Sequence, residues 1–120
     1  MESTVVRNAT GIARLELERQ ETLEKLEHLR LDLLNLAEPT ADETDVDAYE
    51  REKILGLVQS LRRKLESLDR AMEWAQKGNY GICENCGERI DPARLEILPQ
   101  TTLCLRCQRD LERRNRQERF

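Results

Sequence analysis

The stretch CENCGERIDPARLEILPQTTLCLRC covers residues 83–107 and carries two C-x-x-C pairs separated by seventeen residues. Each pair can place two thiolates on one tight turn, and two facing turns give closed tetrahedral sulfur coordination. Gly87, directly after the first pair, lets the backbone turn back under a metal ion. The spacing predicts one structural Zn²⁺, whose four ligands are Cys83, Cys86, Cys104 and Cys107.

The cellular compartment that we expect favours a metal site over disulfide bonds. No apolar run approaches the roughly 20 residues needed to span a bilayer, and the N-terminal residues MESTVVRNATG lack the apolar core of a signal peptide. We therefore expect a cytoplasmic protein without a membrane partner, in which C-x-x-C pairs bind metal. A redox dithiol pair and an iron site remain alternatives. A catalytic zinc is not expected, because four sulfur ligands leave no open position.

Outward from the cysteines, the preceding half of the chain has apolar residues at alternating steps of three and four, the pattern of a coiled-coil seam. A first seam is predicted at Ile12, Leu15, Arg19, Thr22, Leu26, Leu29, Leu33 and Leu36, and a second at Ile54, Val58, Leu61, Leu65, Leu68, Met72 and Ala75. Pro39 should end the first helix near Ala37, and Gly78-Asn79 should end the second near Lys77.

The composition agrees with two long helices. Only 38% of the 120 residues are hydrophobic and 3% aromatic, which is little material for a globular core. We predict an all-α fold in which residues 1–11 form a flexible N-terminus and residues 12–77 a long antiparallel coiled-coil hairpin. Residues 78–120 would form a zinc-finger head and a final short helix from Leu105 to about Arg119. A monomer is expected, and a homodimer that uses the same seams is the alternative.

Charge is unevenly distributed along the chain, although the net charge is only −4. Residues 38–50, here called the acidic tip, contain six acids and no base: Glu38, Asp42, Glu43, Asp45, Asp47 and Glu50. From Arg106 to Arg119 there are six arginines and three acids. These arginines could contact phosphate or an acidic partner, or simply form a solvated helix face.

The run GNYGICENCGERIDPARLEILPQTTLCLRCQRDLE (78–112) closely resembles the DksA/TraR zinc-finger family. The shared elements are the G-x-Y-G-x-C-x-x-C-G start, Ile90, the Arg94-Leu95 pair, Pro99, and the C-x-x-C-Q end. The predicted hairpin before this run matches the longer, DksA-type members.

This resemblance implies a bacterial transcription regulator that binds RNA polymerase directly, without needing contacts to DNA. The hairpin would enter the secondary channel and bring the acidic tip near the active centre, which changes initiation. The family has two aspartates three residues apart in its tip, followed by an alanine. Here Asp42 and Asp45 have that spacing, position 47 is Asp, and the alanine is Ala48.

Two other functions compete with this one. The chain could be a zinc-finger protein that binds nucleic acid through its C-terminal arginines, although net acidity argues against this. It could also be a thiol-based redox sensor in which oxidation ejects zinc. An enzyme is not expected, because the sequence offers no nucleophile–base pair, no phosphate-binding loop and no open metal site.

Overall fold

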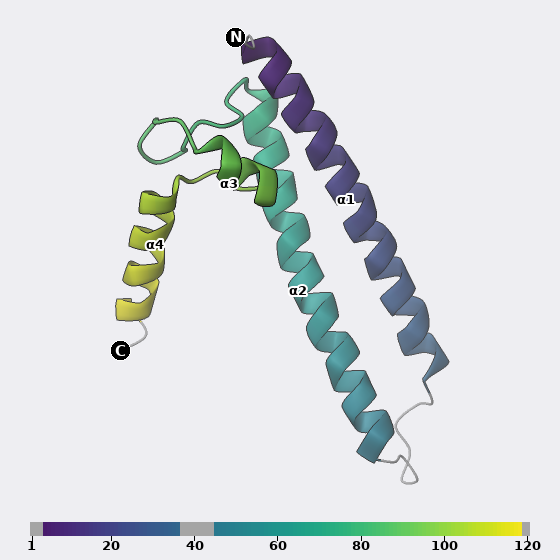
Figure 1. Ribbon diagram of the computed structural model, residues 1–120. Helices are drawn as coiled ribbons and strands as arrows, with labels where there is room; N and C mark the ends of the chain where they lie inside the picture. The colour runs from purple at the N-terminus through teal and green to yellow at the C-terminus, as the bar shows by residue number, and fades with distance from the viewer. Residues whose placement is uncertain (1–3, 37–44, 119–120) are drawn as a thin grey trace. The chain divides into compact units, whose positions relative to one another are not determined.

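The computed structural model describes residues 4–36 and 45–118, which form four α-helices (Figure 1). These are α1 (Thr4–Asn35), α2 (Asp45–Gln76), α3 (Pro92–Ile97) and α4 (Leu105–Glu118). The described residues contain no strand beyond one isolated bridge between Ile82 and Arg89. The predicted all-α fold is confirmed. None of the helices in this part of the chain is long and apolar enough to cross a membrane.

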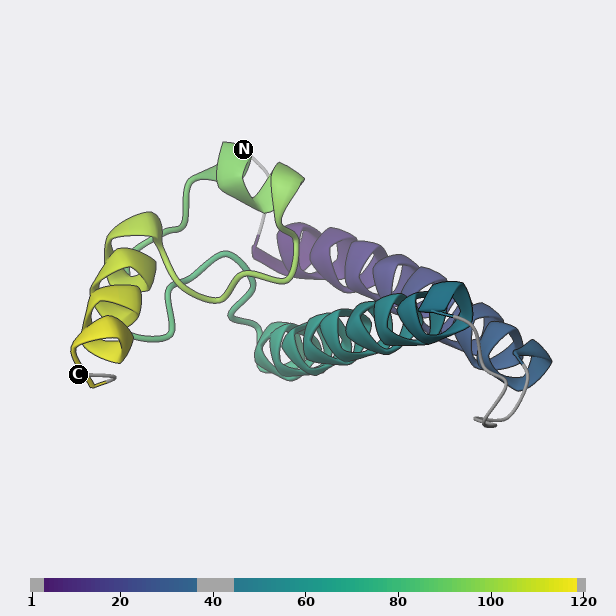
Figure 2. The same ribbon diagram turned by 90° about the horizontal axis from the view of Figure 1, so that it is seen from below.

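The chain divides into two compact units. Unit 1 comprises Met1–Glu16 and Ser67–Phe120, and unit 2 comprises Leu17–Glu66, so α1 and α2 each contribute to both. In each unit a segment of α1 lies beside a segment of α2 in both views (Figure 1 and Figure 2). The predicted pairing of two long helices is therefore present within each unit.

Every predicted seam position of both helices is buried or half-buried. Leu15 and Leu68 are fully buried in unit 1, and Ile54 is buried in unit 2. Two positions of the first seam, Arg19 and Thr22, carry polar side chains, and these are protected as well. Thr22 is only 2% exposed and donates its hydroxyl proton to the Glu18 carbonyl at 2.8 Å.

The ends of the long helices follow local chemistry. After α2, Gly78 has a φ of 84°, and the amides of Gly78 and Asn79 bond to the carbonyls of Ala75 and Trp74 at 2.9 and 3.2 Å. This is the glycine-capped helix end expected from Gly78-Asn79. At the other end, α1 begins at Thr4 and therefore extends into the range that the sequence assigned to a flexible N-terminus, residues 1–11.

The core of unit 1 joins the base of both long helices to the cysteine-bearing segment. It consists of the buried residues Leu15, Leu68, Ala71, Ala75, Tyr80, Cys83, Ile90, Leu95 and Cys107. Two of the four cysteines are thus part of the hydrophobic core. Tyr80 is buried there, and half-buried Trp74 donates from Nε1 to the Ile82 carbonyl at 2.8 Å, so both aromatic residues serve packing within unit 1.

Candidate metal centre

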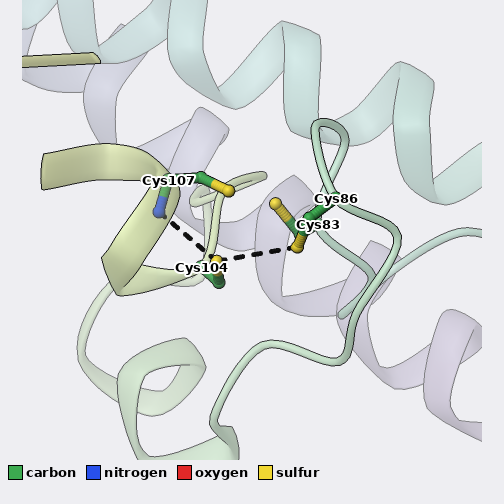
Figure 3. A group of neighbouring side chains, drawn as sticks. All are labelled: Cys83, Cys86, Cys104 and Cys107. Atoms are coloured by element: carbon green, nitrogen blue, oxygen red, sulfur yellow. Dashed lines mark hydrogen bonds between the residues drawn. The ribbon is translucent and has the colours of Figure 1, made fainter. Parts of the chain in front are cut away.

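The four predicted ligands lie together. Their sulfur atoms are all within 4.8 Å of one another, and the Sγ atoms of Cys86 and Cys104 are 3.9 Å apart. Figure 3 shows the four side chains converging from two separate parts of the chain. Four sulfurs bound at about 2.3 Å to one tetrahedral ion lie about 3.8 Å from each other. The site therefore fits Zn²⁺ with only a small contraction, and all four cysteines are free thiols.

The first cysteine pair sits on a tight turn built by backbone hydrogen bonds. The Cys83 amide donates to the Glu88 carbonyl at 2.8 Å, and the Gly87 amide donates to the Cys83 carbonyl at 3.0 Å. Gly87 has a φ of 77°, a conformation that side chains with a Cβ disfavour. The prediction that Gly87 allows the backbone to turn after Cys86 is therefore confirmed.

The second cysteine pair spans the start of α4. Cys104 precedes the helix, Cys107 lies in its first turn, and the Cys107 amide donates to Cys104 Sγ at 3.5 Å (Figure 3). Asn85, which lies between the cysteines of the first pair, donates from Nδ2 to Cys107 Sγ at 3.3 Å. These N–H groups stabilise thiolates, the form in which cysteine binds a metal.

The electrostatics of the site also favour thiolates. Burial raises the pKa of Cys83, but hydrogen bonds from Cys104, Cys86 and Asn85 outweigh burial and lower this pKa from 9.0 to about 6. Arg106 lies close enough to the cysteines for their charges to change its pKa. Its pKa is raised by the charge of Glu88 and then by those of Cys86, Cys107 and Cys104. A positive group beside four sulfurs offsets the negative charge of a four-thiolate zinc site.

A polar cluster that the sequence analysis missed joins the two cysteine turns to α2. Glu84 Oε2 accepts the Thr102 hydroxyl at 2.6 Å and the Arg70 Nε–H at 3.1 Å. The Glu84 amide also donates to the Thr102 carbonyl at 2.8 Å. Glu84 lies within the first cysteine pair and Thr102 lies two residues before the second, so this cluster fixes one pair relative to the other.

A second group missed in the sequence lies in the first turns of α1. Asn8 bonds to the backbone of Gly78 and Tyr80, and Arg14 donates to the Glu96 carbonyl at 2.9 Å. A glycine inside a helical stretch, Gly11, was the available signal, because such a glycine often marks a close contact. The Tyr80 ring fills the space beside it.

The predicted residues of the acidic tip are only partly described. Asp42 lies outside the described residues, and Asp45 is the first residue of α2. Asp47 is half-buried and Ala48 exposed in the first turn of that helix. The tip assignment stays a prediction. His28, the single histidine, is exposed on α1, and the α4 arginines Arg106, Arg109, Arg113, Arg114 and Arg116 are exposed too.

Comparison with known proteins places this geometry in context. Residues 78–113 match the prokaryotic dksA/traR C4-type zinc finger. The RNA polymerase-binding transcription factor DksA of Caulobacter vibrioides is 34% identical over 103 residues, covering 83% of this chain and 69% of that protein. An uncharacterised Aquifex aeolicus protein is 47% identical over 49 residues, covering 41% of this chain and 34% of that protein. The solved structure of transcription factor DksA2 from Pseudomonas aeruginosa matches with a TM-score of 0.77 and 30% identity, covering 92% of this chain and 86% of that one.

Proposed function

Because the chain belongs to the DksA/TraR zinc-finger family, we propose that it binds bacterial RNA polymerase directly and regulates transcription initiation. The observation that carries this proposal is the extent of the similarity. It covers the hairpin as well as the finger, both in the alignment with the Caulobacter protein and in the match to DksA2. A shared finger alone would support only a shared metal site.

In this proposal the acidic tip enters the secondary channel of the polymerase. The carboxylates of Asp42, Asp45 and Asp47 would act near the catalytic magnesium or against basic channel residues, with Ala48 beside them. The start of α2 supports a contact surface here, because Val46 is 69% exposed and Tyr49 is 67% exposed. Large apolar side chains left in solvent are available to a partner.

The finger has a different part in this proposal. Cys83, Cys86, Cys104 and Cys107 hold one structural Zn²⁺, which organises unit 1. Four thiolates around one ion exclude water and substrate from it, so the ion would have no catalytic role, and the chain as proposed is not an enzyme. We place the protein in the cytoplasm as a monomer that acts on the polymerase without binding DNA directly.

A binding and transcription experiment tests the proposal. The wild-type chain should be retained by immobilised cognate RNA polymerase. The D42N/D45N variant should retain most of this binding but lose the effect on initiation. E66Q/E73Q is a matched control, because it removes two carboxylates of α2 that are exposed and lie outside the tip. It should bind and regulate like the wild type.

Each arm of this experiment can fail separately. If the wild-type chain does not bind the polymerase, the partner is wrong. If D42N/D45N regulates initiation normally, the tip mechanism is wrong while the partner stands. A loss of regulation in E66Q/E73Q equal to that in D42N/D45N would assign the effect to overall charge.

The exposed arginines of α4 favour one competing function, direct binding to nucleic acid. Affinity for duplex DNA without polymerase that falls steeply with salt would support it. Replacing Arg113 and Arg114 with Gln should then weaken binding and reduce its salt dependence. Under the polymerase proposal, duplex DNA alone should not retain the chain.

A further inference from the structure

The backbone that leads from α2 into Cys83 is held by a side chain from α1. Asn8 donates from Nδ2 to the Gly78 carbonyl at 3.0 Å, and Asn8 Oδ1 accepts the Tyr80 amide at 2.8 Å. The two bonds use both ends of one amide group. Because both partners are backbone groups, Asn8 fixes the path of the chain three residues before the first metal ligand.

A second side chain holds the same segment from α2. Trp74 donates from Nε1 to the carbonyl of Ile82, the residue directly before Cys83. Cys83 itself is 1% exposed and lies in the core of unit 1. Its position is thus determined on one side by the metal-binding turn and on the other by contacts with both long helices.

The first turns of α1 also contact the far side of the cysteine segment. Arg14 donates from Nη2 to the Glu96 carbonyl at the end of α3, and Leu15 shares the core with Leu95. The segment between the two cysteine pairs is therefore attached to α1 as well. Within unit 1, α1 touches the chain before the first pair and between the pairs.

We propose that Asn8 is a positioning residue for the metal centre, so that zinc binding and the docking of the first turns of α1 stabilise each other. Asn8 touches no ligand atom; it acts through the backbone of Gly78 and Tyr80. A coupling of this kind is reciprocal. If docking of α1 raises the affinity for zinc by some factor, bound zinc raises the equilibrium constant for docking of α1 by the same factor. The proposal does not depend on the polymerase, because both quantities belong to the isolated chain.

The test measures the zinc affinity of the full chain by competition with a chromophoric chelator. N8A should weaken zinc binding about tenfold, the lower end of the loss found when groups that orient metal ligands are removed. N8D keeps an acceptor for the Tyr80 amide but loses the donor to the Gly78 carbonyl, so its affinity should lie between those of N8A and wild type. Alanine favours helix more than asparagine does, so weaker binding cannot come from helix propensity.

Two control variants separate positioning from general stability. N115A makes the same chemical change at an exposed position of α4. L61A removes a half-buried seam side chain from unit 2 and lowers the free energy of unfolding there. Both should bind zinc with wild-type affinity. If L61A weakens zinc binding as much as N8A does, the effect of N8A is general destabilisation and the proposal is overturned.

The effect of zinc on the docking of α1 is measured by amide hydrogen exchange on the wild-type chain. Removing zinc should speed exchange in residues 8–14 of α1 at least tenfold, and should change residues 25–33 much less. Unchanged exchange in residues 8–14 would overturn the proposal, and so would wild-type zinc affinity in both N8A and N8D. Failure of the chain to bind RNA polymerase would leave both measurements unaffected.

Discussion

The ring of Tyr80 lies against the backbone of Gly11. A Cβ atom added at Gly11 would be 2.5 Å from Cδ1 and 2.6 Å from Cγ of that ring. Tyr80 is 7% exposed and its amide is bonded to Asn8, so the ring has little room to move aside. Position 11 requires glycine because of this contact. Backbone conformation is not the reason, since Gly11 lies within the regular helix α1.

Replacing Gly11 with alanine should therefore destabilise the zinc-bound protein. The clash should cost about 1–3 kcal/mol, more than the roughly 1 kcal/mol that alanine gains over glycine in a helix interior. Urea unfolding followed by circular dichroism measures the difference.

Gly56 supplies the matched control for that substitution. It is an exposed residue of α2 with nothing within 4 Å of an added Cβ. G56A should raise the free energy of unfolding by up to about 1 kcal/mol. If G11A and G56A shifted stability in the same direction, the contact with Tyr80 would not limit position 11.

Removing zinc should unfold much of unit 1. Cys83 and Cys107 are 1% and 5% exposed within its core, so loss of the ion leaves thiolates unpaired among apolar side chains. Chelation or C104S should lower the free energy of unfolding by about 3 kcal/mol or more. Thermal unfolding with parallel zinc analysis measures this. An unchanged melting midpoint in the metal-free chain would contradict a structural role for the ion.

The same zinc analysis addresses the redox-sensor alternative. Mild peroxide should leave the ion bound if the site is purely structural. Release of zinc with formation of a disulfide, reversed by thiol reductant, would support the sensor instead.

Thr22 offers a test of the interrupted seam in unit 2. Its hydroxyl is buried and, among the residues that the structure describes, bonds to a carbonyl of its own helix, an interaction that contributes little to stability. T22V keeps the size of the side chain and removes the polar atom, so it should raise the free energy of unfolding by up to about 1 kcal/mol.

T22S is the control at that position, since it keeps the hydroxyl and removes the methyl group. It should lower stability by about 1 kcal/mol. The urea unfolding midpoints of the wild type, T22V and T22S give the order of their stabilities. A T22V protein less stable than wild type would mean that the hydroxyl has a structural role beyond the Glu18 carbonyl.

Asp91 caps the short helix between the cysteine pairs. Its Oδ1 accepts the Ala93 amide at 3.0 Å, and Pro92 follows at the first helical position. D91A should cost about 1 kcal/mol, while D91N should change stability little because it also caps well. Equal losses in D91A and D91N would show that the negative charge stabilises the segment, with the capping bond secondary.

Much of the fold could be predicted from local sequence patterns. The seams were predictable because the three-and-four spacing of apolar residues repeats within each helix, and even Arg19 and Thr22 occupy the protected positions that this spacing assigns. The metal site was predictable for a related reason. C-x-x-C spacing fixes two ligands on one turn, and only the meeting of the two turns is non-local.

The contacts that attach α1 to the finger could not be predicted in this way. Asn8 lies 70 and 72 residues from its two partners, and Arg14 lies 82 residues from Glu96. Polar side chains near a helix start carry no periodic pattern, and their partners are backbone groups, which have no sequence signature. The segment therefore resembles a fraying end until its distant partners are known.

The sharing of one core by Leu15 and Cys107 has a consequence for protein synthesis. A ribosome makes Leu15 long before Cys107, so the core of unit 1 cannot close until Cys107 has been made. Unit 2, which draws only on Leu17–Glu66, is complete much sooner. All residues of unit 2 are therefore present in the nascent chain while unit 1 still lacks α4 and two of its four metal ligands.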